Sequence, residues 1–140
     1  MARAPYEEFE HTADLGLRAR GGTWEDLLAN AGRGMIGLML DPDSVQALHE
    51  RTVEADADDA EALVVAWLGE ILFALDAERF APAAVEVDVA EEGRVRGRLR
   101  GEPLDESRHH VRNVIKAVTW HDLRIVKTEE GYEATVIFDV

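Results

Sequence analysis

Hydrophobic residues follow two different spacings along the chain, and these predict a mixture of strands and helices. Residues 15–20 alternate apolar and polar positions as a half-buried strand does, and residues 6–11 are expected to form a strand before it. The apolar residues from Leu27 to Leu38 follow helical spacing, with Thr23 as a suitable N-cap. Asp41-Pro42-Asp43 closes this unit, and a further strand is expected within residues 45–55.

A second helix is predicted for residues 60–78, which are apolar on most sides. The acidic run at residues 54–61 lacks the central Gly and the final Glu of a calcium-binding loop. We interpret it as a helix start, with Asp58 as the N-cap and Glu61 three residues later. Gly69, Glu70 and Asp76 interrupt the apolar surface well short of the ~20 residues that cross a bilayer. We therefore expect a central core helix and no membrane association.

The letters of a dinucleotide-binding fingerprint occur at Gly32, Gly34 and Gly37. That fingerprint requires a strand before the glycines and a helix after them, whereas these glycines fall late in the first predicted helix. We interpret them as small residues that let this helix approach a sheet closely.

Two β-hairpins can be aligned from their turns, because each contains Glu-Glu-Gly, whose Gly can adopt the left-handed conformation of a bulged turn. Counting outward from residues 91–93 matches apolar with apolar and acid with base. The predicted pairs are Val85–Leu99, Glu86–Arg98, Asp88–Arg96 and Val89–Val95. The arginines at 94, 96, 98 and 100 are therefore interpreted as a salt-paired strand face rather than an RNA-binding track, with docking of an acidic partner as the alternative.

The same count from residues 129–131 predicts a second hairpin that brings an imidazole beside a carboxylate near the end of the chain. The predicted pairs are Val126–Ala134, Lys127–Glu133, Ile125–Thr135, Leu123–Ile137 and His121–Asp139. A bulge within the hairpin would shift them.

Length and composition limit the class of protein. With 140 residues the chain is expected to form one domain, residues 1–140, of the α+β class. It has no Cys, which excludes disulfides and thiolate metal sites, and residues 1–8 resemble no export signal. We expect a cytoplasmic protein. The formal net charge of −14 argues against a general nucleic-acid binder, so any connection with RNA should run through a partner protein.

Both ends of the sequence carry residues suited to metal binding. Residues 11–14 hold His11 and Asp14 at the break between two predicted strands, and Asp139 stands next to Val140. If folding joins the two ends, their oxygen atoms would suit a hard divalent cation. Asp14 as a turn cap and Asp139 as a solvated strand end are the alternatives.

A zinc site is a further alternative, because His109 and His110 follow closely after Asp105. Neighbouring residues on an extended segment point in opposite directions, which argues against this site.

These features occur together in a family of known proteins, and the chain resembles the archease family along nearly its whole length. Departures are slight, chiefly Trp120 where Tyr is expected and Gly69 where a polar residue is expected. The matching pieces are residues 6–14, Asn30-Ala31 to Gly34-Met35, and residues 62–68, 101–105, 116–121 and 138–140.

The resemblance implies a small α+β protein with two main helices packed on a mostly antiparallel sheet with hairpins. Archeases are not themselves catalysts; they assist the RtcB-type RNA ligase of tRNA splicing and RNA repair by promoting its guanylylation and repeated turnover. Carried over to this sequence, the metal ligands fall on Asp14, Asp139 and Val140, and a functionally important lysine falls on Lys116. Oxygen ligands favour Ca²⁺ or Mg²⁺ over zinc.

Within this interpretation, His11 and His121 are expected to lie beside the metal ligands. Two other functions stay open. The chain could be a small metal-dependent phosphoester hydrolase with His121 as its base, although no phosphate-cradling loop is found in the sequence. It could also be a general chaperone or scaffold.

Overall fold

The computed structural model describes residues 4–11, 14–91 and 93–140, with Glu10 and His11 described by their backbone alone. The helices are α1 (Trp24–Met39), α2 (Ala60–Asp76) and a short 3₁₀ helix, η1 (Pro42–Ser44). The strands are β1 (Tyr6–His11), β2 (Asp14–Gly21), β3 (His49–Asp56), β4 (Phe80–Glu91), β5 (Arg94–Pro103), β6 (Ala117–Val118), β7 (Arg124–Thr128) and β8 (Gly131–Asp139).

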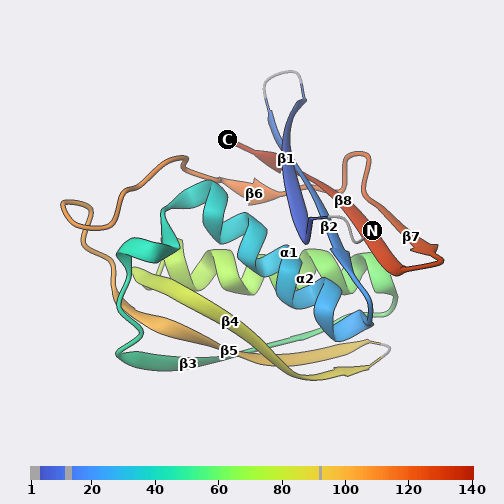
Figure 1. The fold of residues 1–140 in the computed structure, drawn as a ribbon, viewed down its shortest axis with the longest axis horizontal. Coiled ribbons are helices and arrows are strands. Elements are labelled where there is room, and N and C mark those ends of the chain that lie inside the picture. The colour runs from blue at the N-terminus through green and yellow to red at the C-terminus, as the bar shows by residue number, and fades with distance from the viewer. Residues whose placement is uncertain (1–3, 12–13, 92) are drawn as a thin grey trace.

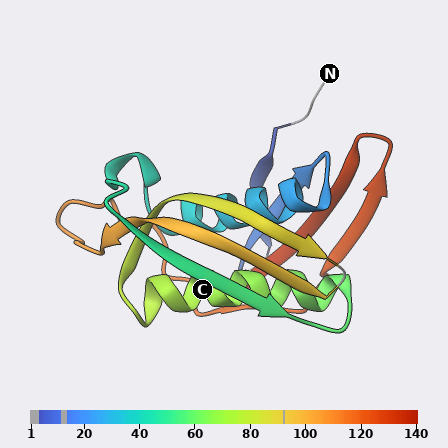
Figure 2. The same ribbon diagram turned by 90° about the horizontal axis from the view of Figure 1, so that it is seen from below.

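The described strands form two antiparallel sheets, and the two α-helices lie between them (Figure 1). The five-stranded sheet has the order β1-β2-β8-β6, with β7 also paired to β8, and the three-stranded sheet has the order β3-β5-β4. Seen from below, the three-stranded sheet covers the helices (Figure 2). The predicted α+β class is confirmed, whereas the division of the strands into two sheets was not predicted.

Helix α1 begins as the sequence predicts, because the Thr23 hydroxyl accepts a hydrogen bond from the Asp26 backbone N–H at 3.1 Å. The glycines are indeed small residues at a close helix–sheet contact. A Cβ atom on Gly34 would lie 2.6 Å from Leu17 on β2 and 3.1 Å from Tyr6 on β1. Close packing on β1 and β2, rather than nucleotide binding, therefore accounts for a glycine at this position.

Helix α2 begins at Ala60, as predicted, but its N-cap is one residue later than expected. Asp59, not Asp58, is the N-cap, and its side chain accepts from the Ala62 backbone N–H at 2.7 Å. Trp67 is fully buried at the centre of this helix, and its indole N–H donates to the Leu28 carbonyl of α1 at 2.9 Å. The two helices are thus joined inside the core. No helix in the described parts of the chain is long and apolar enough to cross a membrane.

The first hairpin, β4–β5, follows half of the predicted pairing. Val85–Leu99 and Glu86–Arg98 are confirmed, but Asp88–Arg96 and Val89–Val95 are wrong, because a shorter turn pairs Val89 with Arg96. The turn is one residue shorter than predicted, and a bulge at Asp88 compensates for the missing residue. Beyond the bulge, away from the turn, the strands therefore pair as predicted.

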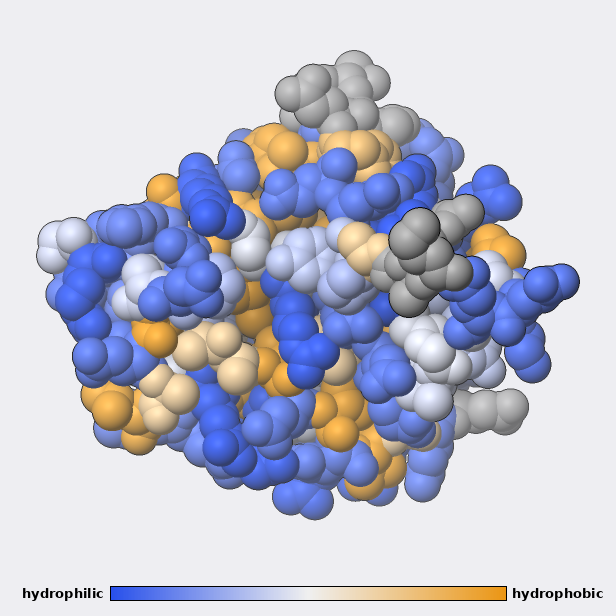
Figure 3. Space-filling model, viewed as in Figure 1, coloured by the Kyte–Doolittle hydropathy of each residue, from blue (hydrophilic) through white to orange (hydrophobic). Residues whose placement is uncertain are grey.

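The predicted salt-paired arginine face is confirmed on the three-stranded sheet. Arg98 binds Glu86 at 2.7 Å and Asp88 at 3.0 Å, and Arg96 lies 3.3 Å from Glu54 on β3. Most of the surface seen from the side of α1 is hydrophilic, with hydrophobic residues in scattered patches between (Figure 3).

Candidate functional site

Strand pairing brings the start of β2 and the end of β8 to one corner of the five-stranded sheet. Asp14 is the first residue of β2 and Asp139 the last residue of β8. Their neighbours Leu15 and Phe138 are directly paired, so Asp14 and Asp139 lie side by side at the ends of adjacent strands. Figure 1 shows the C-terminus beside the β1–β2 hairpin. The predicted meeting of Asp14 with Asp139 therefore occurs.

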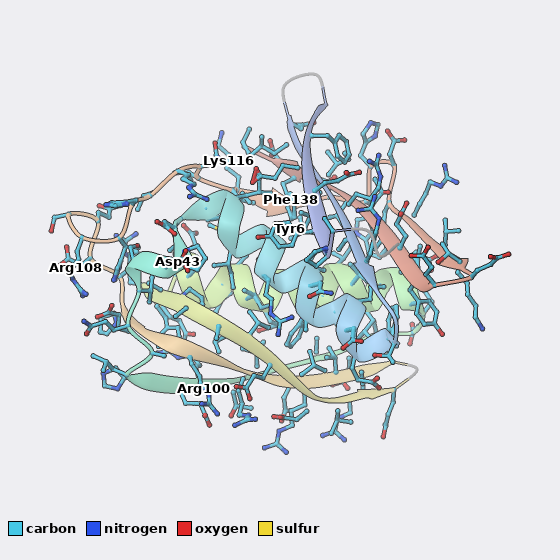
Figure 4. The ribbon with its side chains drawn as sticks, in the orientation of Figure 1. Tyr6, Asp43, Arg100, Arg108, Lys116 and Phe138 are labelled. Atoms are coloured by element: carbon cyan, nitrogen blue, oxygen red, sulfur yellow. The ribbon has the colours of Figure 1, made fainter. Side chains whose placement is uncertain are left out.

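Lys116 joins this corner from a third part of the chain. Its backbone N–H donates to the Asp139 carbonyl at 2.8 Å, and the next residue, Ala117, is the β6 partner of Asp139. In Figure 4 Lys116 is labelled above Phe138, the β8 residue that precedes Asp139. The main chain of Lys116 thus joins the two aspartates, and we call Asp14, Asp139 and Lys116 the carboxylate corner.

The charges of the carboxylate corner are not neutralised by the rest of the described protein. Among the described side chains, none forms an ion pair or hydrogen bond with the side chain of Asp14, Asp139 or Lys116. Lys116 and Asp139 are exposed and Asp14 is half-buried. Two carboxylates on neighbouring strand ends repel each other unless a cation comes between them.

The predicted pairing of His121 with Asp139 is wrong. Thr128 pairs with Gly131, so the loop of the second hairpin has two residues instead of three and the register of β7 shifts by one. Before β7, the residues from Trp120 to Leu123 form a turn that is not paired with β8. His121 lies in this turn, 3.4 Å from the carboxylate of the adjacent Asp122. Ala117 takes the position opposite Asp139.

The remaining predicted site residues lie at the same edge of the sheet. His11 is the last residue of β1 and pairs with Asp14, while its side chain lies outside the described residues. Val140 follows Asp139 and is 37% exposed.

The donor atoms of the carboxylate corner fit a hard cation better than a soft one. Two carboxylates and a main-chain oxygen are ligands that Ca²⁺ and Mg²⁺ prefer, and waters commonly complete such sites. No group of three or more His, Asp or Glu side chains with metal-binding geometry occurs within the described residues. A cation at this corner would therefore depend on the two aspartates and on oxygen atoms from the main chain or solvent.

A buried ionic cluster that the sequence analysis missed lies where β5 ends. Glu102 and His109 are 4% and 0% exposed. The Glu102 carboxylate accepts hydrogen bonds from Arg108 at 2.7 Å, from the Gln46 backbone N–H at 2.7 Å and from His109 Nε2 at 2.9 Å. These donors, Arg108 first, lower the pKa of Glu102 from 4.5 to about 2.

The histidine of this cluster has a defined role in its hydrogen-bond network. Because the Asp105 backbone N–H donates to His109 Nδ1 at 3.0 Å, the ring hydrogen lies on Nε2 and points to Glu102. His110, next in sequence, is exposed, as expected for neighbours that point apart. In the sequence, a Glu followed at seven residues by His gives no signal of burial.

A broad depression of about 1030 Å³ lies at another part of the surface, between β2, α1 and the β7–β8 turn. Arg20 in its lining is neutralised by Glu133 at 2.9 Å and Glu7 at 3.1 Å. Asp14, Lys116 and Asp139 do not line it. The depression is therefore separate from the carboxylate corner.

Comparison with known proteins identifies the family of this α+β chain. The model of the Archease protein family matches residues 6–140. The chain is 37% identical over 139 residues to the protein archease of Methanopyrus kandleri, covering 97% of this chain and 99% of that protein. It is 36% identical over 129 residues to the protein archease of Thermococcus gammatolerans, covering 90% and 91%. The chain therefore belongs to the archease family.

Solved structures agree with this assignment. The solution structure of Methanobacterium thermoautotrophicum protein 1598 has a TM-score of 0.78 and 32% sequence identity, with 97% of this chain and 99% of that chain covered. The crystal structure of an archease, described as a possible chaperone, from Thermotoga maritima has a TM-score of 0.68 at 19% identity, covering 100% and 98%. The second similarity concerns the fold alone.

Proposed function

We propose that this protein is a metal-binding accessory protein of an RtcB-type RNA ligase. It promotes guanylylation of the ligase and its repeated turnover in tRNA splicing and RNA repair in the cytoplasm, and is not itself the catalyst. Family membership supports this function. The observation that carries it is the meeting of Asp14, Asp139 and Lys116 at one corner, with none of their side chains paired to another described side chain.

A divalent cation would neutralise the two carboxylates of this corner. Asp14 and Asp139 supply the negative charge, and Val140 adds a carboxylate or carbonyl oxygen. The sequence has no Cys, and these oxygen donors favour Ca²⁺ or Mg²⁺. With so few ligands from the protein, the cation keeps coordination positions open for water or for a group of the ligase complex.

Lys116 supplies a second positive charge at the same place. The chain has only two lysines, Lys116 and Lys127, and the backbone hydrogen bond from Lys116 to the Asp139 carbonyl supports this role for the first of them. RNA is met only through the ligase, because the net charge of −14 opposes direct binding to phosphates.

A guanylylation assay tests the proposal. Purified RtcB-type ligase is incubated with labelled GTP, with and without this protein and with Ca²⁺, Mg²⁺ or chelator, and the covalent ligase–GMP adduct is measured. We expect the protein to increase adduct formation only in the presence of a divalent cation. Asp14→Ala and Asp139→Ala should abolish the increase while circular dichroism shows a retained fold.

Asp88→Ala is the matched control, because it removes a carboxylate from the ion-paired face of the other sheet. It should stimulate the ligase as the wild-type protein does. Equal stimulation by the wild-type protein and by both corner variants would contradict the metal-site part of the proposal.

The two alternative functions are separated by the same set of proteins. A phosphoester hydrolase would release product from a substrate panel without the ligase, but the base assigned to it, His121, does not lie opposite Asp139. A general chaperone would suppress aggregation of unrelated proteins regardless of metal; the Thermotoga maritima archease is described as a possible chaperone.

A further inference from the structure

Lys116 is carried by a segment with little regular secondary structure. Residues 104–116, which we call the strap, run from the end of β5 to the start of β6 and so connect the two sheets (Figure 1). Their one ladder contact is an isolated bridge between Val111 and Leu40. The conformation of the strap must therefore come from its side-chain and main-chain contacts with neighbouring elements.

The middle of the strap is fastened to the C-terminal end of α1. Three carbonyls at that end, which have no partner within the helix, accept hydrogen bonds from two strap residues. The Gly37 carbonyl accepts from Arg112 Nη1 at 2.8 Å, and the Leu38 carbonyl accepts from Asn113 Nδ2 at 2.7 Å. The Met39 carbonyl accepts from the Arg112 backbone N–H at 2.8 Å.

This contact replaces the usual end of a helix. The last turn of α1 contains no basic residue, so the positive charge at its negative end is supplied by Arg112, 75 residues away from Gly37. The strap and α1 thus form one unit.

The same helix also holds the strand that carries Asp14. Gly34 of α1 packs against Leu17 of β2, and β2 begins at Asp14. At its other end the strap meets only a two-residue strand, β6, at the edge of the sheet. An edge strand of two residues frays easily. The position of Lys116 relative to Asp14 therefore depends more on α1, which contacts both the strap and β2.

From this arrangement we infer that Arg112 and Asn113 are positioning residues that hold Lys116 beside Asp139 by fastening the strap to α1. The inference rests on the proposed function only for the task of Lys116; the positioning itself is a property of the fold. Local contacts offer the competing explanation, because Ile115 is 1% exposed and the Lys116 N–H is bonded to Asp139. If these contacts suffice, Asn113 has no influence on Lys116.

Hydrogen exchange at the Lys116 amide distinguishes the two explanations. Asn113→Ala should increase exchange of this amide about tenfold, the factor expected when one hydrogen bond of ordinary net strength is lost. Asn30→Ala is the matched control, because Asn30 Nδ2 also donates to a carbonyl, that of Arg20, at 2.7 Å beside the same helix. In the control the Lys116 amide should exchange as in the wild-type protein.

The amide of Ile71, buried in α2, shows whether a variant has lost global stability instead. If its exchange rises by the same factor in Asn113→Ala, the milder Asn113→Ser replaces that variant. Unchanged exchange at Lys116 in a stable Asn113 variant would overturn the inference.

Ligase stimulation tests whether the positioning acts through Lys116. Asn113→Ala should reduce stimulation of adduct formation, and it should add nothing when Lys116 is already changed to Met, because both substitutions then remove the same contribution. Independent, additive losses would overturn a role through Lys116. If the wild-type protein itself gives no stimulation, the proposed function fails, and hydrogen exchange alone decides the positioning.

Discussion

Charged residues serve two different purposes in two regions of this molecule. On the three-stranded sheet, acids and arginines face each other across strands, as Arg98 faces Glu86 and Arg96 faces Glu54. At the carboxylate corner, the side chains of Asp14 and Asp139 have no such described partner. Figure 4 shows the two regions apart, with Arg100 on the lower sheet and Lys116 at the upper edge.

The difference lies in how each region is neutralised. Opposite charges across strands stabilise a sheet without any external ion, whereas like charges at adjacent positions destabilise it. The charged side chains of the sheet face therefore find their ion-pair partners within the protein. At the carboxylate corner, a bound cation would remove the repulsion between Asp14 and Asp139. This is the reason for proposing a cation site there.

The largest expected effect is the response of each region to a divalent cation. At a free Ca²⁺ concentration a hundredfold above its Kd, binding should stabilise the wild-type protein by about 2.7 kcal/mol. Asp139→Asn should lose this stabilisation because it removes a charged ligand, and Asp88→Asn on the sheet face should keep it. Thermal unfolding at several Ca²⁺ and Mg²⁺ concentrations measures the shift in Tm.

Chelator supplies the control, since in its presence the metal-dependent part of each Tm must disappear. An equal Ca²⁺-dependent rise in the wild-type protein and in Asp139→Asn would contradict a cation site at this corner.

The second effect concerns the buried cluster around Glu102, a third arrangement of charge in the same protein. The pKa of Glu102 in the folded protein, about 2, lies below that of a Glu in the unfolded chain. The ionised carboxylate therefore stabilises the fold above about pH 4.5. That contribution decreases as the pH falls from about 4.5 toward 2. Glu102→Gln should therefore lower Tm at pH 7 by more than any substitution on the sheet face. The difference in Tm between wild type and Glu102→Gln should become smaller in acid.

Glu54→Gln is a suitable control for this pH dependence, because Glu54 forms an ion pair whose partners are both about half exposed. Urea unfolding between pH 7 and 2.5 gives the free energy of unfolding of each variant. A gap between wild type and Glu102→Gln that stays constant over this range would show that the ionised carboxylate is not the source of the stability.

Most elements could be predicted because local patterns decide them. Thr23 was identified as an N-cap from its place before a helical spacing, and residues 60–78 were recognised as a core helix. The two hairpins show the limit. Both turns are one residue shorter than predicted, but a bulge at Asp88 restores the inner register of the first, and none restores the second.

The candidate site was predicted only in part, for the same physical reason. Asp14, Asp139 and Lys116 were carried over from a family resemblance, and their meeting follows from strand pairing between the two ends of the chain. His121 was misplaced because its position depended on a turn length. The strap contacts join residues 75 positions apart, and the contact of Gln46 with Glu102 joins residues 56 positions apart, which no local spacing reveals.

A smaller effect should appear in the absence of metal. Asp14→Asn or Asp139→Asn removes one of two neighbouring like charges, so we expect the metal-free variant to be more stable than the wild-type protein by about 0.2–1 kcal/mol at low salt. Urea unfolding in chelator measures this change. A loss of stability in both variants would indicate that these carboxylates make contacts within the fold, and would weaken the contrast with the sheet face.

The smallest effect is expected for a single pair on the sheet face. Arg96 and Glu54 are about half exposed, so Arg96→Gln should change the free energy of unfolding by no more than about 0.5 kcal/mol. Raising the salt concentration to 1 M should remove even this difference, since exposed charges are screened. The free energy of unfolding of Arg96→Gln and of the wild-type protein is measured at low and at high salt. The same measurement tests whether the ion pairs of this sheet face need no external ion. A Ca²⁺-dependent difference between the two proteins would mean that the sheet face, too, depends on an external ion.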